Sequence, residues 1–534
     1  MQSTAGAPTV PWSDVIRRLL AEADGLQAAC EYALACGQPL LATAIAGRLL
    51  ERRMERGWLA AACRVAYEAA DLSLASAWAG KLAAITPPSD ADRALMAAIA
   101  GRIELLARLD RPGPARPGWT QEPRRVLAML AFSMPFTSNG YATRSNGLLS
   151  AVRAAGWDVQ PFTRPGYPAD ADRQWAGIEL PVFHDVGVLR YRSLPQPSRR
   201  ELGLIPYLQA AADQIGRTIS ELRPGLVHAA SNYTTALPAC VAAREQGLPF
   251  VYEVRGFWDV TRASSDPKFA RSTEYRYLQL FERALLQKAD SVITLTEAMK
   301  DELVRRGAPA DRIVVAPNAV DVDRLVPVPR DMGLANQLGL PEGMPVIGYV
   351  GSFVDYEGLD DLVEACAILH HAGRRFRLLM VGDGLAWPDI LRRITEVGLH
   401  GCSILPGRVP HDYVPAYYSL MDLCPFPRKP WPVCELVSPL KPFEAMAMGK
   451  AVLVSSVAAL AGSVIEEVNG RVFDKGDPSA LAKVLARGLD DLQAARELGL
   501  RARQWVTAER TWHTSARAVE RAYALAVVHR GAAG

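Results

Sequence analysis

The sequence predicts an α/β protein in which two doubly wound, Rossmann-like domains face each other across a cleft, preceded by an all-α domain. Three observations predict this fold class. The chain has 534 residues, which is too long for a single hydrophobic core. Residues 11 to about 110 are rich in Ala and Leu at helical spacing, and the rest alternates strand and helix segments in two successive runs. Ligands of such sheets bind beyond the carboxyl ends of the strands, so we expect a site in the cleft.

The helical domain is expected over residues 1–112. Five segments between Asp14 and Ile85 carry apolar residues at helical spacing, punctuated by Gly37, Gly57 and Pro87. The part that begins at Gly57 and ends near Pro87 is similar to a tetratricopeptide unit, and a plain helical bundle is the alternative interpretation. Residues 113–123 are expected to form a linker, because Pro and Gly are frequent at its start.

The first alternating unit is expected over residues 124–322. Short apolar runs predict its strands, and longer segments with helical spacing predict the helices between them. The expected strands are 126–131, 157–160, 226–229, 249–254, 291–295 and 313–316, and the expected helices are 145–155, 235–246, 277–288 and 297–306. Residues 161–225 and 257–275 carry no pattern that predicts an element.

The second unit is expected over residues 323–505, because the alternation restarts after Pro327. Its expected strands are 346–350, 376–381, 403–406, 423–425 and 450–455, and its expected helices are 359–371, 387–397 and 414–419. Residues 477–528 are predicted to be mostly helical, and we treat 506–534 as a separate C-terminal helix.

Residues 435–449 carry the clearest pattern for a binding site. Ser438 and Pro439 suit the start of a helix, strong helix formers follow, and Gly449 suits its end. A loop that opens a helix directs backbone N–H groups and a positive dipole end at one point, which predicts an anion site. The carboxylate of Glu444 is expected about one turn into this helix, where it can accept hydrogen bonds from the hydroxyls of a ribose. The alternative is an ordinary amphipathic helix with Glu444 in solvent.

The composition excludes several functional classes. A net charge of +3 gives no case for nucleic-acid binding. The eight cysteines are scattered without a C-x-x-C pair, so we expect reduced thiols in a cytoplasmic protein and no disulfide or zinc framework. The N-terminus has no signal pattern, and no apolar run approaches the roughly 20 residues that span a bilayer, which leaves peripheral membrane contact open.

Four motifs resemble, in their order and spacing, family 4 of the retaining, nucleotide-sugar-dependent glycosyltransferases, which have the GT-B fold of two Rossmann-like domains. These motifs are D-S-V-I-T-L-T at 290–296 leading to P-N-A-V-D at 317–321, G-Y-V-G-S-F at 348–353 with E-G at 357–358, V-G-D-G at 381–384, and residues 435–449. The first unit matches more loosely, at 139–141, 226–228 and 252–256. The resemblance covers roughly residues 124 to 525 and not the N-terminal helices.

The resemblance implies that a nucleotide sugar binds mainly to the second unit, as a co-substrate and with no cofactor and no metal. It implies that Glu444 holds the ribose and that Arg408 and Val409 flank the base. The loop that would offer N–H groups to the diphosphate consists of Ser438, Pro439, Leu440 and Lys441. Gly140 would let the backbone of the first unit approach the donor closely, or is a turn glycine only. The final helix, which carries Trp512, is implied to cross back to the first unit.

Two positions of the second unit lack a cation that is usual in the family. Ser352 stands where an Arg is usual, and Glu357 stands where a Lys is usual; those two cations normally neutralise the diphosphate. We expect Arg428 and Lys429, together with Lys441, to replace them, because a guanidinium is well shaped for bidentate phosphate contact. The alternative is that the basic pair forms a solvated turn.

Three more residues enter as candidates. Glu435 is the candidate for the first carboxylate of the family motif, although eight residues separate it from Glu444 where seven are usual. Arg255 stands where the family has a His; it cannot act as a base, but it can hold the leaving phosphate or the sugar. The alternative is an ion pair with Glu253, which points the same way from a strand end. His228 is interpreted as a packed strand-end histidine.

The implied reaction moves a sugar from a nucleoside diphosphate to an acceptor hydroxyl, with retention at the anomeric carbon. The acceptor can be a glycan, a lipid-linked or a small molecule, and the departing phosphate would help to take its proton. Two alternatives stay open: a nucleotide-sugar epimerase of the same fold, and a catalytically inactive protein whose helices bind a protein partner or a second copy of the chain. Asp321 and Asp323 have the D-x-D spacing of metal ligands, but lie at the implied domain connection and are set aside.

Overall fold

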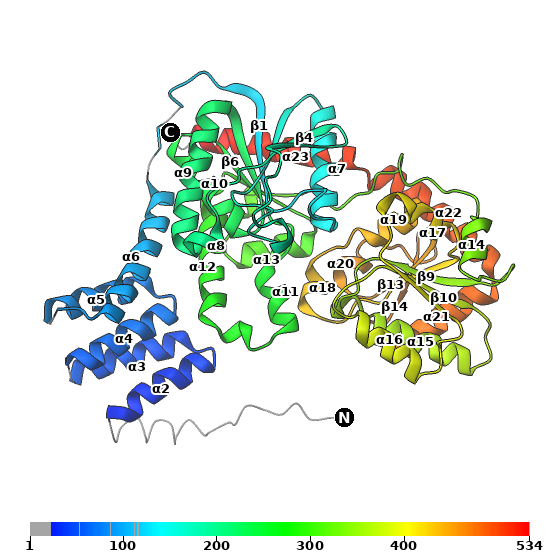
Figure 1. Ribbon diagram of the computed structural model, residues 1–534, viewed down its shortest axis with the longest axis horizontal. Helices are drawn as coiled ribbons and strands as arrows, with labels where there is room; N and C mark the ends of the chain where they lie inside the picture. Colours follow the sequence, from blue (N-terminus) through cyan, green and yellow to red (C-terminus); the bar gives the residue numbers. More distant parts are fainter. Residues whose placement is uncertain (1–22, 53, 86, 112, 115–116, 533–534) are drawn as a thin grey trace.

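The structure is a computed structural model that describes residues 23–52, 54–85, 87–111, 113–114 and 117–532. Figure 1 shows three parts in a row: a helical region, a first α/β unit in the middle and a second α/β unit at the far end. The two predicted Rossmann-like units and the helices before them are therefore confirmed.

The helical region is a succession of antiparallel helices, each packed on the next. They are α2 (Ala23–Ala35), α3 (Pro39–Arg52), α4 (Arg56–Glu68), α5 (Leu72–Ile85) and α6 (Asp90–Asp110). The side chain of Ser89 accepts a hydrogen bond from the backbone N–H of Asp92, and the Asp92 carboxylate accepts one from the N–H of Ser89, so a capping box starts α6. The segment expected before residue 23 lies outside the described residues, and the similarity to a tetratricopeptide unit stays a prediction.

The first unit is built on an eight-stranded sheet with strand order β3-β4-β2-β1-β5-β6-β7-β8. Its strands are β1 (Glu122–Leu130), β2 (Asp158–Thr163), β3 (Phe183–Val186), β4 (Leu189–Arg192), β5 (Pro224–Ala230), β6 (Phe250–Glu253), β7 (Ser291–Thr294) and β8 (Ile313–Val315). Its helices are α7 (Gly140–Ala154), α8 (Arg199–Leu202), α9 (Leu204–Leu222), α10 (Tyr233–Glu245), α11 (Trp258–Ser265), α12 (Thr273–Lys288) and α13 (Glu297–Arg305). Short 3-10 turns lie at η1 (Arg173–Trp175), η2 (Phe269–Arg271) and η3 (Ala310–Arg312).

The second unit is built on a parallel six-stranded sheet with order β11-β10-β9-β12-β13-β14. Its strands are β9 (Val346–Val350), β10 (Arg377–Val381), β11 (Ser403–Gly407), β12 (Leu423–Phe426), β13 (Ala451–Ser455) and β14 (Arg471–Phe473). Its helices and 3-10 turns are α14 (Met332–Gln337), η4 (Asp355–Glu357), α15 (Leu359–His371), α16 (Trp387–Glu396), η5 (His411–Tyr413), α17 (Val414–Ser419), α18 (Pro432–Leu436), α19 (Lys441–Ala447), α20 (Ala458–Ala461), α21 (Pro478–Asp490) and α22 (Leu492–Glu509).

The sequence did not predict the outer edge of the first sheet. Residues 161–225 contain the antiparallel hairpin β3–β4 and the long helix α9. The strands of this hairpin are four residues each, and β3 is mostly exposed, so no apolar run marks them. Helix α7 also begins at Gly140, earlier than the expected 145, because Asn139 accepts a hydrogen bond from the N–H of Ala142 and caps it.

The helical region is docked on the first unit through polar contacts to α6 and α4. Arg108 pairs with Glu245 on α10 and with Asp213 on α9, each at 2.8 Å. The phenol of Tyr277 donates to the carbonyl oxygen of Tyr67 at 2.8 Å. Arg102 lies over the ring of Tyr277 at 4.5 Å from its centroid. These contacts make the helices a fixed extension of the first unit.

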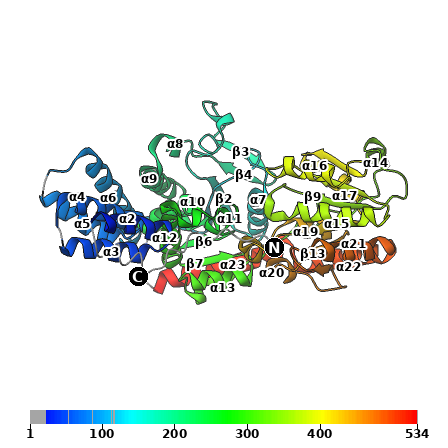
Figure 2. The same ribbon diagram turned by 90° about the horizontal axis from the view of Figure 1, so that it is seen from below.

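The chain passes between the two α/β units twice, and the two passages lie side by side. The backbone N–H of Val320 donates to the carbonyl oxygen of Arg510 at 2.9 Å. The final helix α23 (Trp512–Ala532) then packs against α7, β6, β7 and β8, while α22 packs against α19 and β13. Figures 1 and 2 show α23 lying across the first unit, so the last helix belongs to that unit.

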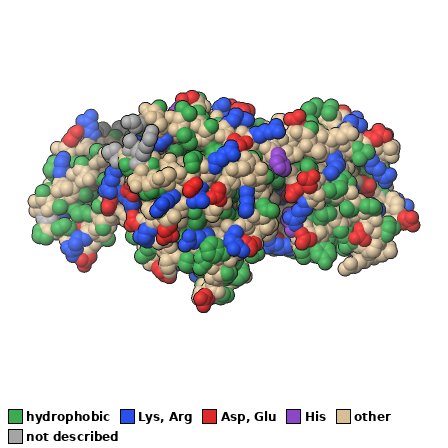
Figure 3. All heavy atoms as spheres, turned by 90° about the horizontal axis from the view of Figure 1, so that it is seen from above, with side chains coloured by type: hydrophobic (Ala, Val, Ile, Leu, Met, Phe, Trp, Pro, Cys, Tyr) green, Lys and Arg blue, Asp and Glu red, His purple; other side chains and the backbone are tan. Residues whose placement is uncertain are grey.

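The surface and the thiols agree with the composition. Basic and acidic side chains are interspersed on the face shown in Figure 3, without a continuous basic area. All eight cysteines are free, and all except Cys36 are buried. Among the described residues, no helix is long and apolar enough to cross a membrane.

Gly147 on α7 offers a test of how α23 is held. A Cβ at this position would lie 2.4 Å from the indole of Trp512, which is closer than packed atoms approach. We expect Gly147→Ala to lower the free energy of unfolding by about 1–3 kcal/mol, the usual cost of overpacking. Gly80→Ala on the exposed face of α5, where nothing lies within 4 Å, is the matched control and should be neutral or slightly stabilising. Urea unfolding measures both; equal stability of the two variants would contradict this packing.

Candidate active site

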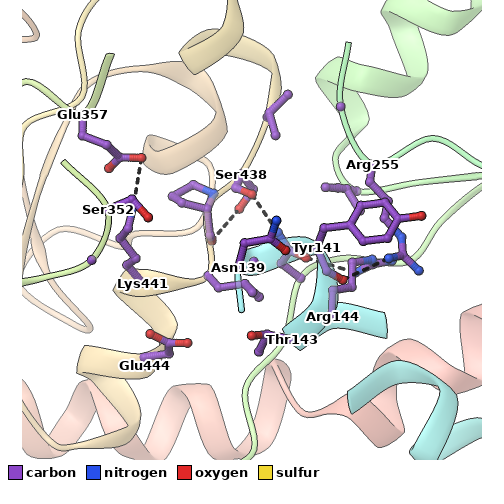
Figure 4. Close-up of a pocket in the computed structure, with 18 of the residues that line it drawn as sticks. Asn139, Tyr141, Thr143, Arg144, Arg255, Ser352, Glu357, Ser438, Lys441 and Glu444 are labelled. Atoms are coloured by element: carbon purple, nitrogen blue, oxygen red, sulfur yellow. Dashed lines mark hydrogen bonds and ion pairs between the residues drawn. The ribbon is translucent and has the colours of Figure 1, made fainter. Parts of the chain in front are cut away.

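A cavity of about 510 Å³ lies between the two α/β units, at the carboxyl ends of both sets of strands. This is the position that the fold predicts for a ligand. It brings together predicted site residues that are far apart in the chain: Gly140, Arg255, Ser352, Arg428, Ser438, Pro439, Leu440, Lys441 and Glu444. Figure 4 shows Lys441, Glu357 and Glu444 on one side and Tyr141, Arg144 and Arg255 on the other.

Four predicted residues do not line this cavity. Glu435 is held elsewhere: one carboxylate oxygen pairs with Lys475 at 2.5 Å, and the other accepts from the N–H of Ala458 at the start of α20. Lys429 pairs at 2.7 Å with both Asp360 and Asp361. These contacts occupy the charges of Glu435 and Lys429 away from the cavity.

Arg408 and Val409 lie on the loop after β11, beside the cavity lining. The guanidinium of Arg408 is 3.9 Å from the carboxylate of Asp383 and donates at 3.4 Å to the carbonyl oxygen of Ser138 in the first unit. The side chain of Val409 packs on the core of the second unit. This loop therefore reaches across to the first unit next to the cavity.

The start of α19 differs from the prediction. We expected Ser438 to cap the helix, but α19 begins at Lys441 and its N-cap, Leu440, makes no capping hydrogen bond with its side chain. The prediction was wrong because Ser438 and Pro439 are in the loop before the helix, where tertiary contacts fix the backbone. Gly449 ends the helix as expected, with a φ of +67° that favours glycine.

The loop before α19 is held through three successive backbone carbonyl groups. Thr296 donates to the oxygen of Leu436 at 3.0 Å, Arg428 to that of Val437 at 2.6 Å, and the amide of Asn318 to that of Ser438 at 2.7 Å. Thr296 and Asn318 belong to the first unit and to the connecting segment. The loop of the second unit is therefore fixed partly from the other side of the cavity.

Glu444 faces the cavity from the first turn of α19. Burial raises the pKa of its carboxyl, and Lys441 opposes this in part. No hydrogen bond to the Glu444 carboxylate occurs among the described residues. Its oxygens are therefore available as acceptors for a bound ligand, which is the arrangement that ribose hydroxyls need.

The first-unit side of the cavity rests on a buried carboxylate, that of Glu253. It pairs with Arg144 at 2.8 Å and with Arg255 at 2.6 Å, and its side chain has no exposed surface. Burial alone would raise the pKa of Glu253, but the charges of Arg255 and Arg144 outweigh it and hold this pKa well below its usual range. The predicted alternative for Arg255, an ion pair with Glu253, is thus present.

Both arginines of this network have little hydrogen-bonding capacity left. Besides Glu253, Arg255 donates to the carbonyl oxygen of Tyr141 and to the hydroxyl of Ser145, and its guanidinium stacks 4.3 Å from the Tyr141 ring centroid. Arg144 donates to three acceptors on residues 316–318 of the connecting segment. The network therefore supports the cavity wall and joins it to the connecting segment.

His228 and Tyr523 extend the network to the last helix. The two side chains are 2.9 Å apart, between Nδ1 of His228 and the phenol oxygen. Nε2 of His228 lies 3.3 Å from the carboxylate of Glu253. His228 is buried, so its interpretation as a packed strand-end histidine agrees with its place in the structure.

The cations on the second-unit side are arranged differently. Arg428 is 3% exposed, and its Nε has no hydrogen-bond partner among the described residues. Lys441 pairs with Glu357 at 2.9 Å. The Lys441 side chain crosses directly over Gly351, where a Cβ would lie 2.2 Å from it. Unlike the guanidinium groups of Arg144 and Arg255, the ammonium group of Lys441 makes one ion pair, so it keeps N–H donors that an anionic ligand can use.

Several cavity residues were missed from the sequence. Asn139 followed by Gly140 was interpreted as a turn, although Asn before a helix is a capping signal that predicts where α7 begins. Trp258, which lines the cavity and is 39% exposed, lies in a segment without any pattern. Arg144 gave no signal, and Asn318 was noted only as part of the motif at 317–321, because only the tertiary contacts show that both side chains are buried beside the cavity.

The described residues contain no cluster of His, Cys, Asp or Glu that could hold a metal ion. Asp321, which was set aside as half of a D-x-D pattern, accepts hydrogen bonds from the N–H groups of Asp323 and Arg324. It therefore shapes a turn in the connecting segment.

Comparison with known families gives two matches, one in each α/β unit. Residues 139–319 match the model of the glycosyl transferase 4-like domain, and residues 344–491 match that of the glycosyl transferases group 1. Both matches lie beyond the helical region and include the two sides of the cavity.

A curated relative and two solved structures extend this finding. The 2-deoxystreptamine glucosyltransferase of Streptomyces kanamyceticus is 31% identical over 281 residues, which are 51% of this chain and 71% of that protein. Sucrose-phosphate synthase of Thermosynechococcus elongatus has the same fold, with a TM-score of 0.61, 24% identity, and coverage of 75% of this chain and 98% of its own. HepE of Anabaena in complex with UDP superposes with a TM-score of 0.55 at 18% identity, covering 74% and 98% of the two chains.

The Glu253 network yields a stability prediction. Glu253→Gln would leave two buried guanidinium groups without their counter-charge, so we expect it to lower the free energy of unfolding by about 3–5 kcal/mol. The matched control is Asp185→Asn, which removes one carboxylate of the exposed pair with Arg190 and should leave stability nearly unchanged. Urea unfolding followed by circular dichroism compares the two; a small loss in the Glu253 variant would show that the network does not support the wall.

Proposed function

Because the chain belongs to the glycosyl transferases group 1 family, whose members are retaining and nucleotide-sugar-dependent, we propose that the cavity binds the donor and transfers its sugar to an acceptor hydroxyl. The chain is a glycosyltransferase, and the residues that carry the reaction are the subject of this proposal. The family membership favours sugar transfer over both alternatives, an epimerase and an inactive binding protein.

The observation that carries the assignment of the donor site is that a carboxylate without a hydrogen-bond partner lies on the same side of one cavity as two cations that share a single counter-ion, Glu357. Glu444 offers acceptor oxygens without a protein partner, Lys441 offers N–H donors, and Arg428 adds positive charge beside it. A ribose diphosphate needs this combination: acceptors for two hydroxyls, and cations for the phosphates. We place the ribose at Glu444 and the diphosphate next to Lys441 and Arg428.

The first unit contributes the start of α7. Asn139, Gly140, Tyr141 and Thr143 line the cavity, so the positive end of the helix dipole and its free N–H groups face the ligand. We propose that this helix end stabilises negative charge on the leaving diphosphate from the side opposite to Lys441. Its backbone can approach the donor at Gly140, where no side chain intervenes.

In the proposed reaction, the acceptor hydroxyl attacks the anomeric carbon on the face from which the diphosphate leaves. The bond from that carbon to the diphosphate oxygen breaks, the bond to the acceptor oxygen forms, and a diphosphate oxygen takes the acceptor proton. The protein positions the two substrates and stabilises the charge that develops on the leaving group. Because Glu435 is held by Lys475 and the N-terminus of α20, outside the cavity lining, we propose that it supports the second unit and does not contact the reacting atoms.

We propose the nature of the substrates by analogy with what two related proteins bind or act on. HepE of Anabaena was solved with UDP, so UDP is the first donor nucleotide to examine. The curated relative of Streptomyces kanamyceticus glucosylates 2-deoxystreptamine, a polyhydroxylated ring. We propose a hydroxylated ring as acceptor here too, with the exposed indole of Trp258 as the aromatic surface against which it lies.

The donor site is tested by nucleotide-induced thermal stabilisation. A nucleoside diphosphate at about 100 times its dissociation constant should stabilise the wild type by roughly 2.7 kcal/mol. Glu444→Gln should lose most of that stabilisation, because its amide cannot replace both acceptor oxygens. Glu364→Gln, on α15 of the same unit and paired with Arg393, is the control and should respond like the wild type. No stabilisation by any nucleoside diphosphate, in folded protein, would contradict the proposal.

The raised pKa of Glu444 predicts a pH dependence of nucleotide binding. The ionised carboxylate is the form that accepts from both hydroxyls, and burial raises its pKa. Nucleotide affinity should therefore fall as the pH is lowered through the raised folded-state pKa of this carboxyl, because the carboxylate is lost by protonation. Titration calorimetry should show a steeper loss in the wild type than in Glu444→Gln, since phosphate ionisation affects both equally. Parallel profiles would exclude Glu444 as the ribose carboxylate.

A further inference from the structure

A buried carboxylate lies where an anion-binding cavity would be expected to have a cation. Glu357 is 2% exposed, ends the turn η4 after β9, and lines the cavity beside Lys441 and Arg428. A negative side chain at this place opposes the binding of a diphosphate by electrostatic repulsion. The contacts of Glu357 indicate which role its charge has in the cavity.

Oε1 of Glu357 is shared between the two cations of the proposed donor site. It lies 2.9 Å from Nζ of Lys441 and 3.5 Å from Nε of Arg428, the latter without a hydrogen bond. Oε2 accepts from the phenol of Tyr349 at 3.4 Å. Figure 4 shows the side chains of Glu357 and Lys441 pointing toward each other, with the ion pair between them.

The two cations differ in how firmly they are held. Arg428 is fixed by its hydrogen bond to the carbonyl oxygen of Val437 and by its position over the ring of Tyr356. The only anion in contact with Lys441 among the described residues is Glu357, and its flexible side chain is 18% exposed. Of the two, Lys441 is therefore the cation that can turn toward a ligand.

We propose that Glu357 is an internal counter-ion that occupies Lys441 while the cavity is empty and gives it up to the diphosphate of the donor. This inference rests on the proposed function and adds a residue that sets how tightly the nucleotide is held. When Lys441 turns to the phosphate, Arg428 and Tyr349 remain next to Glu357, so its charge is not left without a partner.

The consequence is weaker binding of the nucleoside diphosphate than the cations alone would give. A part of the attraction between Lys441 and the phosphate is offset by the ion pair that must be broken first. The same competition favours release of the nucleoside diphosphate after the sugar has been transferred, because the ion pair between Glu357 and Lys441 forms again. Glu357 is in this sense a residue that sets affinity for the donor nucleotide and does not contact the reacting atoms.

The test compares the affinity for the nucleoside diphosphate that stabilises the wild type, UDP first, across four proteins. These are the wild type, Glu357→Gln, Lys441→Met and the double variant, measured by titration calorimetry. Glu357→Gln should bind UDP about 5- to 20-fold more tightly than the wild type, because Lys441 no longer has a competing anion. In the Lys441→Met background the same change should alter the affinity less than about twofold.

Two outcomes would overturn the inference. One is that Glu357→Gln binds UDP as the wild type does or more weakly, which would make Glu357 a support for the site. The other is an equal tightening with and without Lys441, which would assign the effect to the general potential of the cavity. If the wild type binds no nucleoside diphosphate at all, the proposed function itself fails, which separates the two failures.

Glu357→Asp is the alternative variant for this test if Glu357→Gln does not fold. Aspartate retains the buried charge next to Arg428 but withdraws it from Lys441 by one methylene group. A smaller tightening of UDP binding than for the glutamine variant is expected, and unchanged or weaker binding contradicts the inference. Circular dichroism melting of each variant verifies that only folded protein is compared.

Discussion

The buried carboxylate of Glu253 is the interaction on which the geometry of the cavity depends. It is the counter-charge that Arg144 and Arg255 share, and Arg144 in turn binds the segment that joins the two α/β units. That segment carries Asn318, whose amide accepts from Arg144 through its oxygen and donates through its nitrogen to Ser438 of the loop before α19. One desolvated charge thus connects the first sheet, the connecting segment and the loop before α19, because buried guanidinium groups need a fixed counter-charge and fixed acceptors.

The two sides of the cavity use their cations in opposite ways. On the first-unit side, Arg144 and Arg255 donate their N–H groups to acceptors within the protein. These hydrogen bonds fix the wall of the cavity. On the second-unit side, Arg428 and Lys441 share one counter-ion, Glu357, so an anionic ligand can complete the contacts of Lys441. A rigid wall opposite incompletely satisfied donors is a reasonable arrangement for an enzyme that must position its substrates without moving its own scaffold. The last helix takes part through Tyr523 and His228, which lie behind the rigid wall.

Most of the fold could be predicted, and the failures have physical causes. Strands such as β9 (Val346–Val350) and helices such as α15 (Leu359–His371) were predicted with their bounds, because burial on a parallel sheet imposes a continuous apolar run and helical spacing. The hairpin β3–β4 was missed because four-residue, half-exposed strands have no such pattern. The capping role of Ser438 was wrong because contacts from Asn318 and Arg428, and not local propensity, fix the loop before α19. Within the site, Glu444 and Lys441 line the cavity and their donor-binding roles stay predictions, while Lys429 faces two aspartates outside it.

The sequence by itself determined the alternation of strands and helices over most of the chain, the presence of two Rossmann-like units and the motifs that resemble a glycosyltransferase family. These features are encoded locally, in the periodicity of apolar residues and in the spacing of short motifs. Both can be recognised without knowing which residues are in contact in the folded chain. Only the tertiary structure decided which charged groups form ion pairs. Glu357 pairs with Lys441, Glu253 with Arg255, and Glu435 with Lys475. The reason is that an ion pair depends on the distance and burial of groups that are remote in the chain, and neither quantity is written in the residues next to them.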